Sequence, residues 1–99
     1  MERNDVLSAG GGQYTLTFLN DGNLVLQYQG VQTTWQSGTA GSGAHVVMQG
    51  DGNLVIYNWS WAPVWATGTV GNPGAYLNVQ DDGNLVVYSA SNTPLWSIR

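Results

Sequence analysis

Apolar and polar residues alternate along two short runs in each third of the chain. In the middle third, Val46 and Met48 precede an Asp-Gly-Asn triplet, and Leu54 and Ile56 follow it. An apolar residue at every second position is typical of a β-strand with one buried face. Asp-Gly-Asn favours a tight turn, because glycine adopts positive φ and the Asp and Asn side chains can bond the local backbone. The pattern therefore predicts a β-hairpin.

This hairpin pattern occurs three times. Asp-Gly-Asn-Leu-Val begins at Asp21, Asp51 and Asp82, with spacings of 30 and 31 residues. A tryptophan follows each Asp by fourteen positions; these are Trp35, Trp65 and Trp96. Such a period indicates an internal repeat. We predict one domain, residues 1–99, made of three repeats at about 5–39, 40–69 and 70–99.

No segment has helical periodicity, and the connections between repeats are rich in glycine, which disfavours helices. The sequence predicts an all-β fold with three short antiparallel sheets. Each sheet is too small to be stable alone, so the three are expected to pack their inner faces together, with one periodic tryptophan from each repeat in the core near a common axis.

The opposite face of the middle hairpin carries a different set of side chains. Residues of one parity there are Gln49, Asp51, Asn53, Val55 and Tyr57, and the matching residues of the third repeat are Gln80, Asp82, Asn84, Val86 and Tyr88. Amides, a carboxylate and a phenol can read hydroxyl orientation, and valine can cover ring carbon. The set fits a small neutral polyol and contains no cation for an anionic ligand.

Composition narrows the choice of partners. The 99 residues include two Arg, no Lys and six acidic residues, for a net charge of −4, which argues against nucleic-acid binding. No apolar run approaches the ~20 residues of a membrane span, so we expect no membrane insertion. The first residues do not resemble a secretory signal, and without cysteine the sequence leaves the cellular location open.

The motif Gln-x-Asp-x-Asn-x-Val-x-Tyr, with its repeat and its following tryptophan, resembles the monocot (bulb-type) mannose-binding lectins over essentially the whole chain. Complete copies begin at Gln49 and Gln80. The resemblance implies a β-prism II fold of three four-stranded sheets and binding of terminal α-mannose without metal, cofactor or catalysis. It also implies that Asp and Asn contact the 2-hydroxyl, Gln the 3-hydroxyl and Tyr the 4-hydroxyl, while Val packs on the ring.

The first repeat departs from this motif. Asp21, Asn23 and Val25 are present, but Leu19 replaces Gln and Gln27 replaces Tyr. We expect a weak or inactive site there, although a β-bulge could reorient Tyr28 and Gln27 itself could reach a hydroxyl. Plant members that resemble the chain often carry cysteines where Gly22 and Ala44 stand, which points away from a plant secretory protein.

Three functions other than that of a lectin could use similar residues. A glycosidase needs two carboxyl groups about 5 to 10 Å apart, whereas the three Asp occupy equivalent places in different sheets, and Asp81 and Asp82 should face opposite sides. A calcium loop would need further oxygen ligands and a terminal Glu, which are absent. A lectin-like scaffold that binds protein after losing sugar recognition is the alternative that remains open, because the first repeat has lost part of its motif.

Some residues fall outside the repeat. Trp59 and Trp61 have no counterparts in the other repeats, and an extended sugar contact, a dimer surface and loop packing are all open for them. The lone His45 is expected to be a surface or internally paired residue. The family resemblance also implies a homodimer formed by C-terminal strand exchange, here through residues 95–98, with mannose-containing glycans as partners.

Overall fold

The chain folds into ten β-strands and no helix, so it has no helix that could cross a membrane. The computed structural model describes residues 1–99. The first sheet contains β1 (Val6–Ser8), β2 (Tyr14–Phe18), β3 (Leu24–Tyr28) and β4 (Gln32–Gln36). The second contains β5 (His45–Met48), β6 (Leu54–Tyr57) and β7 (Pro63–Ala66). The third contains β8 (Tyr76–Val79), β9 (Leu85–Tyr88) and β10 (Pro94–Ser97).

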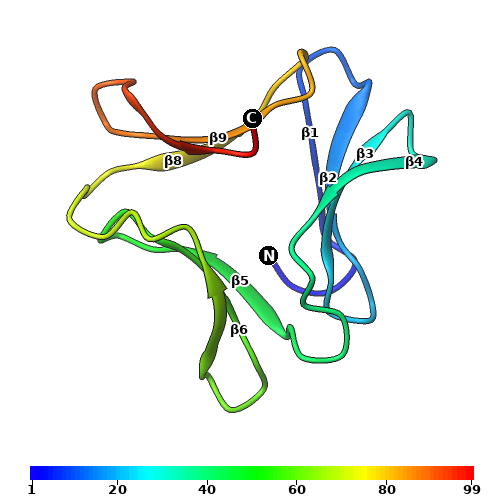
Figure 1. Ribbon diagram of the computed structural model, residues 1–99, viewed down its shortest axis with the longest axis horizontal. Helices are drawn as coiled ribbons and strands as arrows, with labels where there is room; N and C mark the ends of the chain where they lie inside the picture. The colour runs from blue at the N-terminus through cyan, green and yellow to red at the C-terminus, as the bar shows by residue number, and fades with distance from the viewer.

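The three sheets surround a common centre, one sheet per repeat (Figure 1). Every strand pairs with its neighbours in antiparallel register. The molecule is flat along the viewing direction of Figure 1, with extents of 35 × 34 × 19 Å. The predicted all-β fold of three short antiparallel sheets is confirmed.

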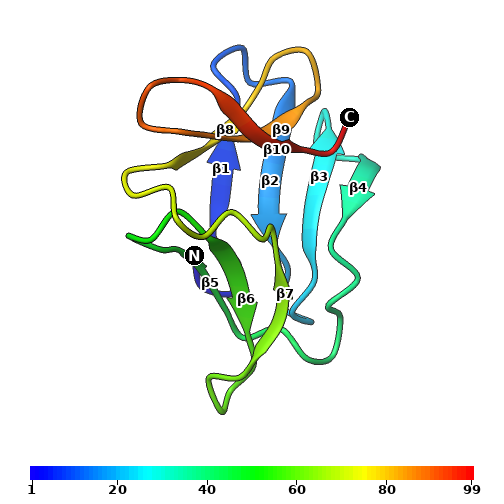
Figure 2. The ribbon, with the colours of Figure 1, turned by 60° about the vertical axis from the view of Figure 1, so that its left-hand side comes forward.

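The sheets differ in their number of strands. Only the first has four, because β1 pairs with β2 and no equivalent strand covers β5 or β8. The expectation of three four-stranded sheets is therefore wrong for two of them within this chain. The N-terminal segment partly compensates at the second sheet, where it lies beside β5 (Figure 2). The N of Met1 donates to the oxygen of Val46 at 2.6 Å, and the N of Val46 donates to the oxygen of Met1 at 2.9 Å.

A single apolar core joins the sheets. The alternating positions that flank each turn supply nearly all of this core. As predicted, alternate residues lie on opposite faces of the strand, with Leu54 and Ile56 in the core and Val55 on the other face of β6. The buried cluster consists of Leu16, Phe18, Leu24, Leu26, Val46, Leu54, Ile56, Ala75, Leu85 and Val87. Burial of this shared face supplies the stability that no single sheet has.

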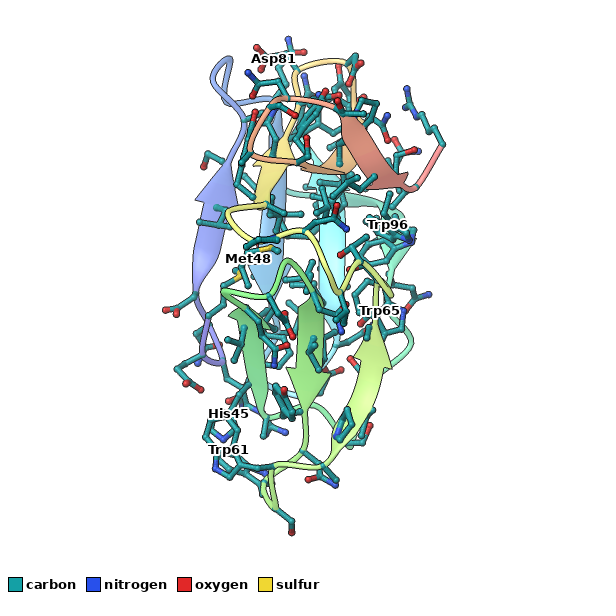
Figure 3. All side chains as sticks on the ribbon, turned by 90° about the vertical axis from the view of Figure 1, so that its left-hand side faces the viewer. His45, Met48, Trp61, Trp65, Asp81 and Trp96 are labelled. Atoms are coloured by element: carbon teal, nitrogen blue, oxygen red, sulfur yellow. The ribbon has the colours of Figure 1, made fainter.

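The periodic tryptophans meet one another. The ring centroids of Trp35, Trp65 and Trp96 are 5.6 to 6.0 Å apart with edge-to-face geometry, and Figure 3 places Trp65 beside Trp96. Edge-to-face pairs at this spacing are favourable. All three rings pack against the apolar core but stay half-buried, so they close one end of the core and are less deeply buried than predicted.

Glycine is required in the first two turns by close backbone approach. A Cβ on Gly22, whose φ is +91°, would lie 2.2 Å from the backbone oxygen of Gly43, and one on Gly52 (φ +93°) would lie 2.2 Å from that of Asn72. Each turn is thus pressed against the segment that leads to the next sheet. Gly22 and Ala44, the positions for which the resemblance implied cysteines in plant members, lie at such a junction, and here the backbones of Gly22 and Gly43 pack directly.

Candidate functional site

The middle site consists of Gln49, Asp51, Asn53, Val55 and Tyr57. Gln49 follows β5, Asp51 and Asn53 lie in the turn, and Val55 and Tyr57 belong to β6. The backbone N of Gln49 bonds the oxygen of Asn53 at 2.8 Å, which closes the turn. Because alternate strand residues share a face, Val55 and Tyr57 lie opposite Leu54 and Ile56. The fold thereby gathers the five predicted residues along one hairpin.

The aspartate of each motif is fixed by its own turn. Oδ1 of Asp51 accepts the backbone N–H of Asn53 at 3.0 Å, and the same bond is 2.9 Å for Asp82 and Asn84 and 2.9 Å for Asp21 and Asn23. The residue itself is exposed in all three repeats. One carboxylate oxygen thus holds the turn, while the other is left without a protein partner and can accept from a ligand hydroxyl.

Glutamine and tyrosine bond each other across the hairpin. Nε2 of Gln49 donates to the hydroxyl of Tyr57, and Gln80 donates to Tyr88 in the same way. This leaves the glutamine Oε1 as an acceptor and the tyrosine O–H as a donor. The two side chains are held in place and present complementary groups toward the same side of the motif.

Asn53 also holds the loop that follows β7, a structural role that the sequence analysis did not predict. Its Oδ1 accepts from Oγ1 of Thr67 at 3.2 Å and from the backbone N of Gly68 and Thr69 at 3.0 and 3.2 Å. Asn23 holds the loop after β4 through the same three kinds of bond. In the middle site the amide Nδ2 has no protein partner, so one side of Asn53 supports the fold and the other faces the site.

The valine is less accessible than predicted. Val55 is 3% exposed and Val86 is 2% exposed, although neither belongs to the central core. Val55 is flanked on its face by its cross-strand partners Val47 and Ala66. Val55 and Val86 therefore lie on the predicted face of each hairpin, but they are buried there as the floor of the site and are not accessible as expected.

The third site repeats this arrangement with one change. Gln80, Asp82, Asn84, Val86 and Tyr88 take equivalent places on the hairpin of β8 and β9. Oδ1 of Asn84 accepts from the backbone N of Leu85 at 3.0 Å. Ile98, which stands two residues after its tryptophan as Thr67 does, has no hydroxyl to donate to Asn84. The Arg99 guanidinium donates instead to the backbone oxygen of Asp82 at 2.8 Å and so holds this turn.

In the first repeat, a residue outside the motif engages the amide of Asn23. Nδ2 of Asn23 donates to Oε1 of Gln36 at 2.7 Å, and Asn23 is only 6% exposed. Gln36 pairs with Val25, the position taken by Ala66 and Ser97 in the other repeats. The difference is visible in the sequence, because the residue after the periodic tryptophan is Gln36 in the first repeat but the smaller Ala66 and Ser97 in the others.

The missing tyrosine is not restored by a bulge. In all three repeats the irregular pairing lies between the middle strand and the last strand of the sheet. In the first repeat it falls between Leu26 and Gln27, whereas β2 pairs with β3 without interruption. Tyr28 consequently stays on the face of Leu26 and packs on Tyr14, with ring centroids 5.1 Å apart. Gln27 occupies the position of Tyr57 and Tyr88.

Both complete sites are open surfaces, and the structure has no deep pocket. No group of three His, Cys, Asp or Glu side chains lies close enough to hold a metal ion. Asp81 is engaged elsewhere, because its Oδ1 accepts the backbone N of Gly11 at 2.6 Å, at the end of the molecule opposite His45 in Figure 3. The arrangement offers hydrogen bonds to a ligand at the surface.

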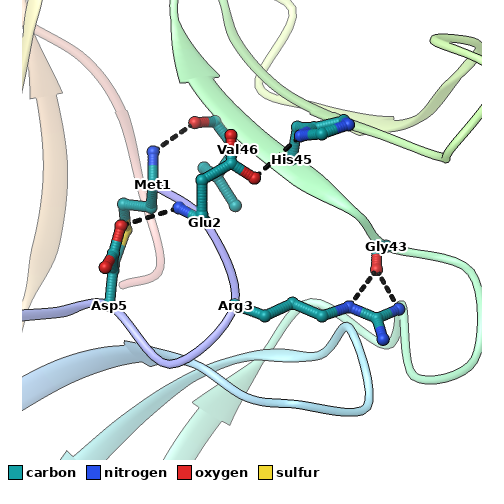
Figure 4. A network of polar contacts seen from close by, with 7 residues as sticks. All are labelled: Met1, Glu2, Arg3, Asp5, Gly43, His45 and Val46. Atoms are coloured by element: carbon teal, nitrogen blue, oxygen red, sulfur yellow. Dashed lines mark hydrogen bonds and ion pairs between the residues drawn. The ribbon is translucent and has the colours of Figure 1, made fainter.

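His45 lies beside the middle site with paired neighbours. Its Nδ1 is 2.8 Å from Oε2 of Glu2 (Figure 4), and its ring stacks on that of Trp61 with centroids 4.0 Å apart and planes 2° apart (Figure 3). The Trp59 ring is T-shaped to the His45 ring, with centroids 5.4 Å apart. The prediction that His45 is an internally paired residue is confirmed.

Comparison with known proteins gives matches among solved structures, whereas no protein-family model and no curated protein matches the chain. A lectin from the mushroom Marasmius oreades is 30% identical, with a TM-score of 0.92 over 100% of this chain and 83% of that one. A monomeric monocot mannose-binding lectin from Gastrodia elata is 39% identical, with a TM-score of 0.83 over 98% and 86% of the two chains.

A third match comes from a bacterium. The domain-swapped lectin dimer of Mycobacterium smegmatis is 42% identical, with a TM-score of 0.57 over 100% of this chain and 92% of that one. Identity at this level over nearly the full length, together with the β-prism II arrangement of three sheets, carries the assignment. The chain belongs to the monocot (bulb-type) mannose-binding lectin family.

Proposed function

We propose that the protein is a lectin that binds terminal α-mannose reversibly at two sites, the middle site and the third site, without catalysis or metal. The observation that carries the proposal is the same constellation built twice. In each, an exposed carboxylate, an amide and a phenol bonded to a second amide surround a valine floor. Such a set can accept from and donate to adjacent sugar hydroxyls.

The groups divide the ligand between them by chemistry. The free carboxylate oxygen of Asp51 accepts from a hydroxyl, the Nδ2 of Asn53 donates to one, and the Gln49 and Tyr57 pair offers one acceptor and one donor. We assign the 2-hydroxyl to Asp and Asn, the 3-hydroxyl to Gln and the 4-hydroxyl to Tyr. The third site uses Asp82, Asn84, Gln80 and Tyr88 in the same roles.

Affinity at each site should be low. An open surface exchanges water hydrogen bonds for protein ones at small net gain, so we expect roughly millimolar binding, about −4 kcal/mol. Two sites on one chain raise avidity toward a surface that carries several mannoses. A homodimer that exchanges residues 95–98 would bring four such sites together, although β10 pairs with β9 of its own chain in this structure.

Substitution of the two aspartates tests the proposal. Asp51→Asn together with Asp82→Asn keeps the oxygen that holds each turn but removes the free acceptor, so retention on immobilised mannose should be lost while the circular dichroism spectrum stays the same. Asp21→Asn is the matched control, because the first-repeat turn has the same bond, and it should be retained like the unmodified protein. Full retention of the double variant would refute the assignment.

A glycan array separates the lectin from the protein-binding scaffold. A lectin of this kind should bind mannosylated glycans and ignore other sugars. If the folded protein binds no glycan on the array, the scaffold reading replaces the lectin, and exposed Trp59 and Trp61 would become the first candidates for a protein contact.

A further inference from the structure

An aromatic cluster borders the middle site, and its two tryptophans have no equivalent at the third site, where Tyr76 stacks on Tyr88. It consists of His45, Tyr57, Trp59 and Trp61, called the aromatic shelf below. The Tyr57 ring, which belongs to the middle site, lies 5.6 Å from that of Trp61. Trp59 is 66% exposed and Trp61 is 58% exposed. The shelf is therefore continuous with the sugar site at one end and open to solvent over most of its tryptophan surface.

The hairpin loops of the middle and third repeats have the same backbone bonds. Asn58 N donates to Ala62 O at 2.9 Å as Ser89 N does to Thr93 O at 2.8 Å, and the bonds of Trp61 N and Asn92 N close each turn in the same way. Trp61 and Asn92 are thus equivalent, and so are Trp59 and Ala90. The two loops differ in their side chains and share one geometry.

That geometry is unfavourable for tryptophan. Trp61 has φ +61° and Asn92 has φ +68°. Asparagine adopts this left-handed region readily, whereas a bulky residue there is an outlier. The middle repeat thus accepts a conformational cost that its twin avoids. Strain of this kind, found beside a site, is a reason to look for function in the side chain that causes it.

Packing fixes the shelf without covering it. His45 pairs across the sheet with Tyr57, is held by Glu2, and stacks on one face of Trp61. The guanidinium of Arg3 lies 5.1 Å from the ring centre of Trp59 and bonds the backbone oxygen of Gly43 (Figure 4). The rings are therefore held in position before a ligand arrives, which lowers the cost of binding.

We infer that the aromatic shelf binds a second pyranose, one linked to the mannose held in the middle site. This inference rests on the proposed function. An uncharged sugar ring presents apolar C–H faces that pack on aromatic rings, and the exposed hydroxyl of Ser60, between the two tryptophans, makes no protein hydrogen bond and is free for a sugar hydroxyl. The middle site then recognises a disaccharide, whereas the third site, bordered by Tyr76 and Asn92, recognises mannose alone.

The test exchanges the shelf for the side chains of its twin. Trp59→Ala with Trp61→Asn copies Ala90 and Asn92 and relieves the strained φ, so the variant should fold at least as well in this loop. Binding of methyl α-mannoside and of the three α-linked mannobioses (1→2, 1→3 and 1→6) is followed by ¹⁵N NMR. The side-chain amides of Gln49 and Gln80 report the two sites separately in one sample.

In the unmodified protein, at least one mannobiose should bind the middle site roughly three- to tenfold more tightly than methyl α-mannoside. The exchanged loop should lose that preference while keeping the monosaccharide affinity, and the third site should show no preference in either protein. A preference that survives the exchange, or none in the unmodified protein, overturns the shelf. Loss of dimers on exchange, with unchanged mannobiose binding, would assign it to a second copy of the chain.

Failure of the proposed function looks different. In that case methyl α-mannoside leaves the Gln49 and Gln80 signals unmoved in the unmodified protein, before any loop is exchanged.

Discussion

The first and middle repeats share a scaffold and differ in the polar groups that they leave free for a ligand. Both keep Asp, Asn and Val of the motif, and in both these residues hold the turn, anchor the following loop or fill the sheet. The residues lost from the first repeat are Gln and Tyr, whose bond to each other joins two groups of the site. The first repeat thus keeps the residues that hold the fold and lacks the Gln and Tyr pair that we assign to the ligand.

Gln36 adds a second lesson to this comparison. Its Oε1 accepts from the side-chain amide of Asn23. The equivalent amide of Asn53 has no protein partner, because Ala66 stands at the position of Gln36. The Asp-Gly-Asn-Leu-Val segment alone is therefore a sign of the turn. Both proposed sites also contain the outer Gln and Tyr and a small residue after the tryptophan.

The largest expected effect concerns the part that the repeats share. Trp35→Ala and Trp65→Ala should each lower the free energy of unfolding by about 3 to 5 kcal/mol, because either change opens the tryptophan cluster at the end of the core. Urea denaturation followed by circular dichroism measures the loss. Equal losses would support a scaffold common to both repeats, and a stable Trp65 variant with altered sugar preference would show that this residue serves the site.

Next in size are the glycines of the two turns. Gly22→Ala and Gly52→Ala place a Cβ 2.2 Å from a backbone oxygen at positive φ, so each should cost about 2 to 4 kcal/mol of unfolding free energy. Gly50→Ala, beside Gly52 in the middle repeat, is the control, because its Cβ meets nothing within 4 Å. Its denaturation midpoint should barely move. A midpoint for Gly22→Ala as high as that of the control would mean that the turn is not pressed against residue 43.

Rebuilding the first repeat would sharpen the comparison further. The missing pair is supplied, and Asn23 is freed, by three changes made together: Leu19→Gln, Gln27→Tyr and Gln36→Ala. A new site of roughly millimolar affinity should then appear in the first repeat. An NMR titration with methyl α-mannoside would detect it in the signals of the first hairpin. The double variant Leu19→Gln with Gln27→Tyr, which keeps Gln36, is the matched control and should stay inactive. If it binds equally well, Gln36 does not prevent binding.

The smallest effect is expected from removal of metal. EDTA should leave retention on immobilised mannose unchanged, because every group assigned to the ligand is held by protein hydrogen bonds. Retention lost with EDTA and recovered with Ca²⁺ would return the calcium reading of the Asp-x-Asn segment.

Much of the fold could be predicted from periodicity. The alternation around Leu54 and Ile56 identified the buried face, and the repeat of Asp-Gly-Asn predicted three hairpins. The unequal number of strands could not be predicted, because neither the pairing of β1 with β2 nor that of Met1 with Val46 is indicated by a local pattern. The part played by Gln36 likewise depends on a contact across 13 residues, and the φ of Trp61 contradicts the preference of its residue type.

The central claim is that two of three similar hairpins bind an uncharged hexose. A ¹⁵N NMR titration of the full chain with methyl α-mannoside tests it most directly. The account predicts saturable shifts in the side-chain amides of Gln49, Asn53, Gln80 and Asn84, with those of Asn23 and Gln36 unmoved. Shifts confined to the first hairpin, or no shifts at any of the three, would contradict it.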